Sequence, residues 1–177
     1  ESKRPRHFLT GILGFTILVY GQLIIAAIMR HTHSGLAIPD FPTMGGYVIP
    51  PFNEAMLQTI NAWRFDGDLE AVKMWQVKIH FLHRLLAGII ACFVMYLTWQ
   101  AIQYCPKNVR IVSAVLLLNV LVITQIGLGI VTVLSQKPSL LTSFHVVCGA
   151  AVLGMSVLLA LRASPLKFGN FRNLILP

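Results

Sequence analysis

The chain has 177 residues, of which 56% are hydrophobic and only 11% are charged, and its formal net charge is +8. A soluble domain carries charge on about 25% of its residues, so this composition excludes an ordinary soluble protein and indicates a membrane protein. The excess of positive charge does not require a nucleic-acid partner, because lysine and arginine gather beside membrane spans on the cytoplasmic side.

Four apolar stretches are each long enough for a membrane-spanning helix, which needs roughly 20 residues. We predict an all-α transmembrane four-helix bundle in a single membrane domain, residues 1–177, with helices at about 8–29, 74–102, 109–134 and 141–162. A long loop, 30–73, joins the first two helices. Its proline and glycine residues exclude a long helix in the first half, whereas Glu54 to Phe65 predicts a short amphipathic helix.

The basic residues predict how the helices are oriented in the membrane. One side collects the two ends of the chain and the second connection, with Lys3, Arg4, Arg6, Lys107, Arg110, Arg162, Lys167 and Arg172. The other side has fewer over a much longer stretch, namely Arg30, Arg64, Lys73, Lys78 and Lys137, and it holds every acidic residue except Glu1. We therefore expect both termini in the cytoplasm and the long loop on the outer face.

A weak internal repeat relates the two halves of the chain. Gln22 and Gln125 lie at similar distances from the ends of the first and third helices, and each is followed by a returning helix with an early histidine. This pattern predicts two helix hairpins related by a pseudo-twofold axis. Such duplication often places a shared site at the interface between the repeats.

Two histidines lie near the starts of the second and fourth apolar stretches, where polar residues are costly and usually functional. The expected helix bounds place His83 and His145 at depths that differ by about one helical turn. Neutral imidazoles facing each other in a four-helix bundle suit heme iron. We predict a bis-histidine heme site near the outer face, with His83 and His145 as axial iron ligands. The alternative is that both are hydrogen-bonded bundle residues.

Three more polar residues belong to this predicted site. Arg84 is expected to pair with a heme propionate, because guanidinium groups bind carboxylates well, or else to extend to the outer interface. Gln125 is a candidate to hydrogen-bond a heme edge, or else makes a helix–helix contact. His80 lies one turn before His83, on the same face of the helix. Four roles are open for it: a group that supports His83, a proton carrier, a ligand of another group, or a plain interfacial histidine.

These residues resemble the pattern of the heme A synthase family, and the resemblance covers most of the chain. Members have an arginine before a Ser-Gly-Leu segment, an acid between prolines, a His-Arg pair on the second helix, a similar end to the third helix and a histidine opening the fourth. The matching positions here are Arg30, Ser34-Gly35-Leu36, Pro39-Asp40-Phe41-Pro42, His83-Arg84, Thr124 to Val133, and His145.

The resemblance implies an enzyme that oxidises the methyl at position 8 of heme O to a formyl group, giving heme A for terminal oxidases. Typical members have two similar four-helix halves, each with a bis-histidine site, one for the substrate and one for heme b; smaller four-helix members exist. This chain resembles the amino-terminal half. The implied cofactors are iron with heme b, heme O or heme A.

The resemblance also implies partners and a location. A second heme would need a homo-oligomer, another heme-binding subunit or a further half of the chain beyond these residues. A terminal oxidase or heme O synthase is a further expected partner. The expected location is the lipid bilayer of a bacterial or archaeal cytoplasmic membrane or of the mitochondrial inner membrane.

Two departures from the family pattern bear on catalysis. Members have a glutamate three residues before the His-Arg pair, and here that position is His80, which is therefore the candidate catalytic residue. The loop cysteine pair of many members is absent. The sequence thus supports two functions: a heme A synthase, or a non-catalytic bis-histidine heme b subunit for electron transfer or heme handling in a respiratory complex.

Overall fold

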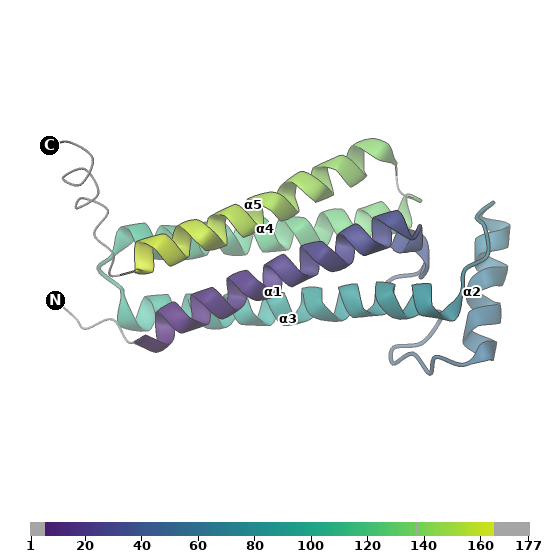
Figure 1. The fold of residues 1–177 in the computed structure, drawn as a ribbon, viewed down its shortest axis with the longest axis horizontal. Helices are drawn as coiled ribbons and strands as arrows, with labels where there is room; N and C mark the ends of the chain where they lie inside the picture. Colours follow the sequence, from purple (N-terminus) through teal and green to yellow (C-terminus); the bar gives the residue numbers. More distant parts are fainter. Residues whose placement is uncertain (1–5, 137, 165–177) are drawn as a thin grey trace, which may run out of the picture.

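The computed structural model describes residues 6–136 and 138–164, and this part of the chain is almost entirely helical. The long helices are α1 (Arg6–His31), α3 (Met74–Tyr104), α4 (Val109–Leu134) and α5 (Ser139–Ala163), and they lie side by side in one bundle (Figure 1). All four are long and apolar enough to cross a membrane. The predicted all-α membrane bundle is confirmed.

The bundle has two different ends (Figure 1). The first and last described helices begin and finish at one end, here called the termini end. The other end, here called the loop end, carries the 3₁₀ turn η1 (Ser34–Leu36) and the short helix α2 (Glu54–Asp66), which runs across the bundle axis. Several residues used to predict the orientation lie outside the described part of the chain: Lys3, Arg4, Lys137, Lys167 and Arg172.

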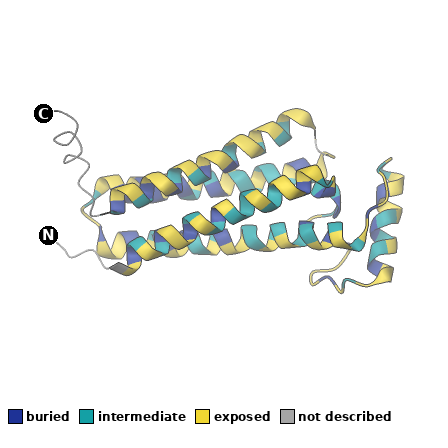
Figure 2. Cartoon of the chain, in the orientation of Figure 1, coloured by how far each residue is buried: buried dark blue, intermediate teal, exposed yellow. Residues whose placement is uncertain are grey.

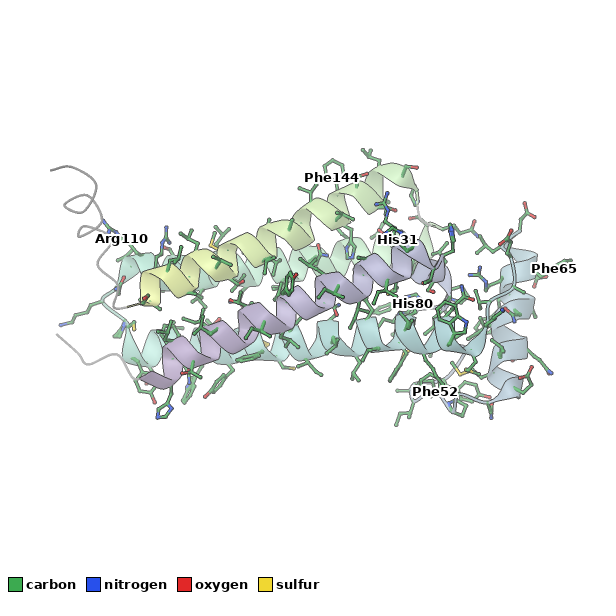
Figure 3. The ribbon with its side chains drawn as sticks, viewed as in Figure 1. His31, Phe52, Phe65, His80, Arg110 and Phe144 are labelled. Atoms are coloured by element: carbon green, nitrogen blue, oxygen red, sulfur yellow. The ribbon has the colours of Figure 1, made fainter. Side chains whose placement is uncertain are left out.

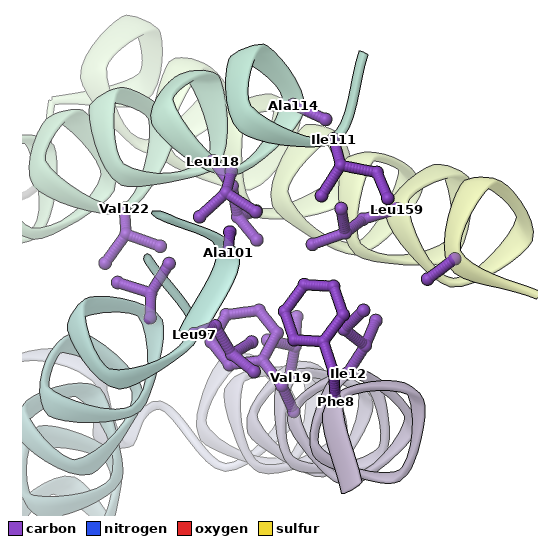
Figure 4. Close-up of a cluster of buried hydrophobic side chains, with 14 of the residues drawn as sticks. Phe8, Ile12, Val19, Leu97, Ala101, Ile111, Ala114, Leu118, Val122 and Leu159 are labelled. Atoms are coloured by element: carbon purple, nitrogen blue, oxygen red, sulfur yellow. The ribbon is translucent and has the colours of Figure 1, made fainter. Parts of the chain in front are cut away.

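The bundle core repeats at alternating steps of four and three residues. On α1 the buried side chains are Phe8, Ile12, Phe15 and Val19, and on α4 they are Ile111, Val115, Leu118 and Val122. Each residue of the α4 set lies the same number of positions after its counterpart on α1, since 111 − 8 equals 122 − 19. Alternating steps of this kind place one apolar stripe along a helix and pack neighbouring helices at about 20°. Figure 4 shows part of this core.

Helices α3 and α5 share a second constant offset. Their buried residues in the termini half include Ile90, Val94, Leu97 and Ala101 on α3, and Val152, Ser156, Leu159 and Ala163 on α5. Here 152 − 90 equals 163 − 101. Because both helix pairs keep their register, the α1–α3 hairpin corresponds to the α4–α5 hairpin residue by residue. The pseudo-twofold relation predicted from Gln22 and Gln125 therefore extends through the whole core.

The apolar core fills only the half of the bundle nearest the termini end. Its last members toward the loop end are Val19, Ile90, Val122 and Val152. Beyond them the helices are mostly half-buried or exposed, and the next buried cluster lies under the loop (Figure 2). The large apolar cluster of the core thus does not extend into the loop half of the bundle.

Candidate functional site

Each long helix places one polar side chain at the same level, just beyond the apolar core. These residues are Gln22 on α1, His83 on α3, Gln125 on α4 and His145 on α5, here called the polar layer. They continue the register of the core, since 125 − 22 equals 111 − 8, and 145 − 83 equals 152 − 90. The packing that aligns the core residues therefore also brings these four together.

Within each hairpin a glutamine contacts the histidine of the returning helix. The amide nitrogen of Gln22 donates a 2.9 Å hydrogen bond to the backbone carbonyl of His83. The amide nitrogen of Gln125 lies 3.3 Å from Nε2 of His145. The structure thus pairs His145 with Gln125, both of which the sequence singled out, and pairs His83 with Gln22.

The polar layer contains buried atoms that lack hydrogen-bond partners. They are Oε1 of Gln22, Nδ1 of His83, Oε1 of Gln125 and Nδ1 of His145. Oγ1 of Thr132, two turns further along α4, is also without a partner. Each buried polar atom left unpaired destabilises the fold by roughly 1–3 kcal/mol. Several such atoms in one layer of the bundle therefore indicate a binding site for a ligand.

Two glycines make room for these side chains. A Cβ on Gly129 would lie 3.1 Å from Cε1 of His145, so the imidazole packs directly on the α4 backbone. A Cβ on Gly149 would lie 3.1 Å from the amide nitrogen of Gln125. Sequence reasoning missed both glycines, because their role depends on which helix lies opposite.

The donor set fits heme better than a bare metal ion. In the part of the chain that the structure describes, no three His, Cys, Asp or Glu residues gather as a metal site. A structural zinc ion needs four ligands, whereas a porphyrin already supplies four nitrogens and leaves only axial positions to the protein. Two half-buried imidazoles, each with a buried and unpaired Nδ1, match that requirement.

Arg84 faces the loop rather than the bundle interior. Its Nη1 donates to the carbonyl oxygens of Asp40 (2.9 Å) and Thr43 (3.2 Å), and its Nη2 donates to that of Ile38 (2.9 Å). With the bond from Nε to His80, four of the five guanidinium hydrogens are engaged. A two-pronged pairing with a propionate would require some of these bonds to break, so that role stays a prediction.

His80 is buried, and two donors converge on its ring. Figure 3 shows His80 on α3 toward the loop end of the bundle. The backbone N–H of Ile38 donates to Nδ1 at 3.0 Å, and Nε of Arg84 lies 3.2 Å from Nε2. A neutral imidazole has one acceptor nitrogen, so it satisfies only one of these donors fully. A carboxylate would accept both. The surroundings of His80 therefore suit the glutamate that the family pattern has there.

The loop that Arg84 holds is itself built around Asp40. The carboxylate of Asp40 accepts hydrogen bonds from the N–H groups of Gly45 (2.8 Å) and Gly46 (3.0 Å), both of which adopt positive φ. Burial raises the pKa of Asp40, but the hydrogen bonds from Gly46, Thr43 and Gly45 outweigh it, and the pKa lies below its usual value. Asp40 is therefore ionised and fixed at neutral pH.

Arg64 on α2 holds two further points of the loop by hydrogen bonds. Its guanidinium donates to the carbonyl oxygens of Leu36 and Glu70, and the side chain is only 5% exposed. Burial lowers the pKa of Arg64, and the nearby Glu70 charge partly opposes that effect. The three cysteines are all free, so hydrogen bonds and not a disulfide hold this loop.

Comparison with known proteins places the chain beside heme-related membrane proteins. Residues 1–157 match the family model COX15-CtaA, described as cytochrome oxidase assembly protein. The heme A synthase of Shewanella oneidensis is 26% identical over 155 residues, which are 86% of this chain and 44% of that protein. The heme A synthase of Wolbachia pipientis subsp. Culex pipiens is 30% identical over 131 residues, 73% of this chain and 34% of that protein.

A third relative gives the same proportions. The heme A synthase of Orientia tsutsugamushi strain Boryong is 29% identical over 140 residues, 77% of this chain and 34% of that protein. The chain therefore spans less than half the length of the curated relatives that it matches. No solved structure matches the chain.

Replacing Arg84 with glutamine is expected to release the loop from α3. Each hydrogen bond to a charged group contributes about 1.5–3 kcal/mol, so losing several should speed backbone hydrogen exchange at Ile38, Gly45 and Gly46 at least about tenfold. The exposed Arg30→Gln variant is the control and should exchange like the parent. Unchanged exchange in Arg84→Gln would contradict the assignment of Arg84 as the residue that holds the loop.

Proposed function

The chain belongs to the COX15-CtaA family of cytochrome oxidase assembly proteins, and we propose that it acts in heme A biosynthesis as a heme-binding membrane protein. The observation that carries this proposal is the polar layer, with its two imidazoles and its unpaired buried atoms at one level of an otherwise apolar bundle. The matched heme A synthases support the heme assignment.

In this proposal His83 and His145 are the axial ligands of one heme iron. A bound heme iron would supply one-electron and oxygen chemistry at this level of the bundle. The protein would supply two neutral imidazoles from helices in different hairpins, so that ligand binding ties the hairpins together. The heme would occupy the loop half of the bundle, because the large apolar core stops at Val19, Ile90, Val122 and Val152.

Gln125 would orient the ring of His145. An imidazole bound to a metal through one nitrogen carries a proton on the other, and that N–H usually has an acceptor. Gln125 already lies 3.3 Å from Nε2 of His145, and its Oε1 has no other partner. A rotation of the amide would present Oε1 to the ring N–H and leave the remaining ring nitrogen for iron. Gln22 occupies the corresponding position beside His83.

The finer proposal is oxidation of the position-8 methyl of heme O to the formyl of heme A. The described helices offer one pair of facing histidines, so a second heme site would come from outside these four helices. The predicted cytoplasmic termini would put the polar layer near the outer face of the membrane. His80 and the carboxylate of Asp40, both held by the loop, are the nearest candidates to move protons.

Replacing His83 or His145 with alanine is expected to abolish the low-spin heme spectrum of the purified protein, because each variant removes one axial ligand. His7→Ala, which alters an exposed histidine at the termini end, should leave the spectrum unchanged. Extracted pigment then tests the reaction: heme A or a hydroxylated heme O supports synthesis. A colourless parent protein, or an unchanged spectrum in His83→Ala, would refute the proposed site.

A methyl group added next to His145 tests the geometry without removing a ligand. Gly129→Ala places a Cβ 3.1 Å from the imidazole, so the ring must shift and heme retention should fall about 10–100-fold, as it does when partners behind metal ligands are altered. Gly127→Ala, two residues earlier on another face of the same helix, meets no atom within 4 Å and is the matched control. Equal heme retention in the two variants would show that His145 does not bind the iron.

The second candidate function is a non-catalytic heme b subunit, and the histidine at position 80 favours it. His80→Glu is expected to retain heme and to keep the loop in place, because a carboxylate accepts from both Ile38 N–H and Arg84. His80→Leu should lose the loop contacts, as seen by hydrogen exchange at Ile38. If hydrogen exchange at Ile38 were as fast in His80→Glu as in His80→Leu, the side chain at position 80 would not hold the loop by accepting hydrogen bonds.

Pigment analysis of the same variant separates the two functions. Heme A in the parent protein supports the enzyme. Unmodified heme in the parent together with heme A in His80→Glu supports the second candidate, in which only the carboxylate is missing.

A further inference from the structure

We propose that the segment Phe41–Phe52, here called the apolar hairpin, is embedded in the lipid at the membrane interface beside α3. The hairpin follows Asp40 and turns tightly at Gly45 and Gly46, where Met44 and Tyr47 exchange backbone hydrogen bonds of 2.8 and 3.3 Å. This inference does not depend on heme binding. It assigns a partner, the bilayer, to a part of the long loop that composition alone would place in water.

The hairpin is uncharged and unusually exposed. No Asp, Glu, Lys or Arg occurs between Asp40 and Glu54. Val48 is 79% and Ile49 is 85% exposed. These fractions match those of Ile17 and Ile123 on the membrane-spanning helices, at 71% and 70%. Adjacent apolar side chains with this exposure form a patch that water solvates poorly, and such patches mark interaction sites.

The position of the hairpin places this patch beside the membrane span. The ring of Phe52 packs edge-to-face on Phe81 of α3, with centroids 5.1 Å apart, and Figure 3 shows Phe52 on the flank of the bundle. Phe81 lies three residues further into α3 than the exposed Lys78, or about 4.5 Å deeper at the helical rise. Arg84, deeper again, binds the carbonyl of Thr43. The hairpin therefore lies against the side of the span, not above its end.

At its turn, residues 44–47, the hairpin satisfies its backbone N–H groups within the protein. Lipid tolerates irregular backbone only where its polar groups are satisfied, so the turn suits a position at the membrane interface. The N–H groups of Met44 and Tyr47 bond within the turn, and those of Gly45 and Gly46 bond to Asp40. Prolines at 42, 50 and 51 have no N–H to satisfy. The carbonyls of Asp40 and Thr43 are taken by Arg84.

Lipid is favoured over a protein partner because the patch continues the apolar surface of the bundle. Trp63 of α2 approaches the turn, since a Cβ on Gly46 would lie 3.4 Å from its ring, and Trp63 is itself 41% exposed. Tryptophan is enriched where membrane and water meet. The hairpin thus lies between an interfacial tryptophan and the lipid-facing side of α3.

The test is carbene labelling of the full chain in liposomes, with the diazirine placed on the lipid acyl chain and the modified peptides identified by mass spectrometry. Peptide 41–53 should be labelled as strongly as peptides from α1 and α4, whereas peptide 67–73, with Asp68 and Glu70, should stay unlabelled. Ile49→Asp should lower hairpin labelling at least about threefold without changing α1. Gln58→Asp, on an exposed polar position of α2, is the matched control and should change neither.

Two results would overturn the proposal. One is labelling of the hairpin by a water-soluble diazirine and not by the lipid probe, which would place it in water. The other is protection from both probes that disappears when the protein is diluted with lipid, which would identify a second copy of the chain as the occupant.

Discussion

One shared register governs this structure: all four long helices present their inward side chains at alternating steps of four and three residues. Tight packing fixes the vertical position of each helix against its neighbours. The offset in residue number between α1 and α4 is constant, and so is the offset between α3 and α5. Each core residue of one hairpin therefore has a counterpart in the other. Gln22 with Gln125, and His83 with His145, continue the two offsets beyond the end of the core.

The register explains the position of the site. It also explains why the protein by itself leaves polar groups of the site without hydrogen-bond partners. Four polar side chains replace four apolar ones, and four buried polar atoms of these side chains lack partners. A folded protein does not normally leave so many buried groups unpaired, so the arrangement is understandable as a binding site. The loop depends on the same helix, because Arg84, next to His83 in the chain, holds the carbonyls of residues 38, 40 and 43.

Part of this could be predicted from the sequence. Four long apolar stretches fix the number of membrane helices, and His83 and His145 stand out because polar residues are costly in such helices. The position of Arg84 was predictable, but not its contacts, since its partners are backbone carbonyls of a loop that has no sequence signature for them. The roles of Gly129 and Gly149 depend on side chains from the facing helix. Gln22 was visible as a repeat, yet only the structure brings it to His83.

The most direct test of the central claim, that the polar layer is one ligand site between the two hairpins, is a heme titration. Heme b would be added to the purified heme-free chain, and binding followed by absorption and electron paramagnetic resonance. The account predicts saturation at one heme per chain, with a low-spin bis-imidazole spectrum. Saturation with a high-spin spectrum, or no saturable binding, would contradict it.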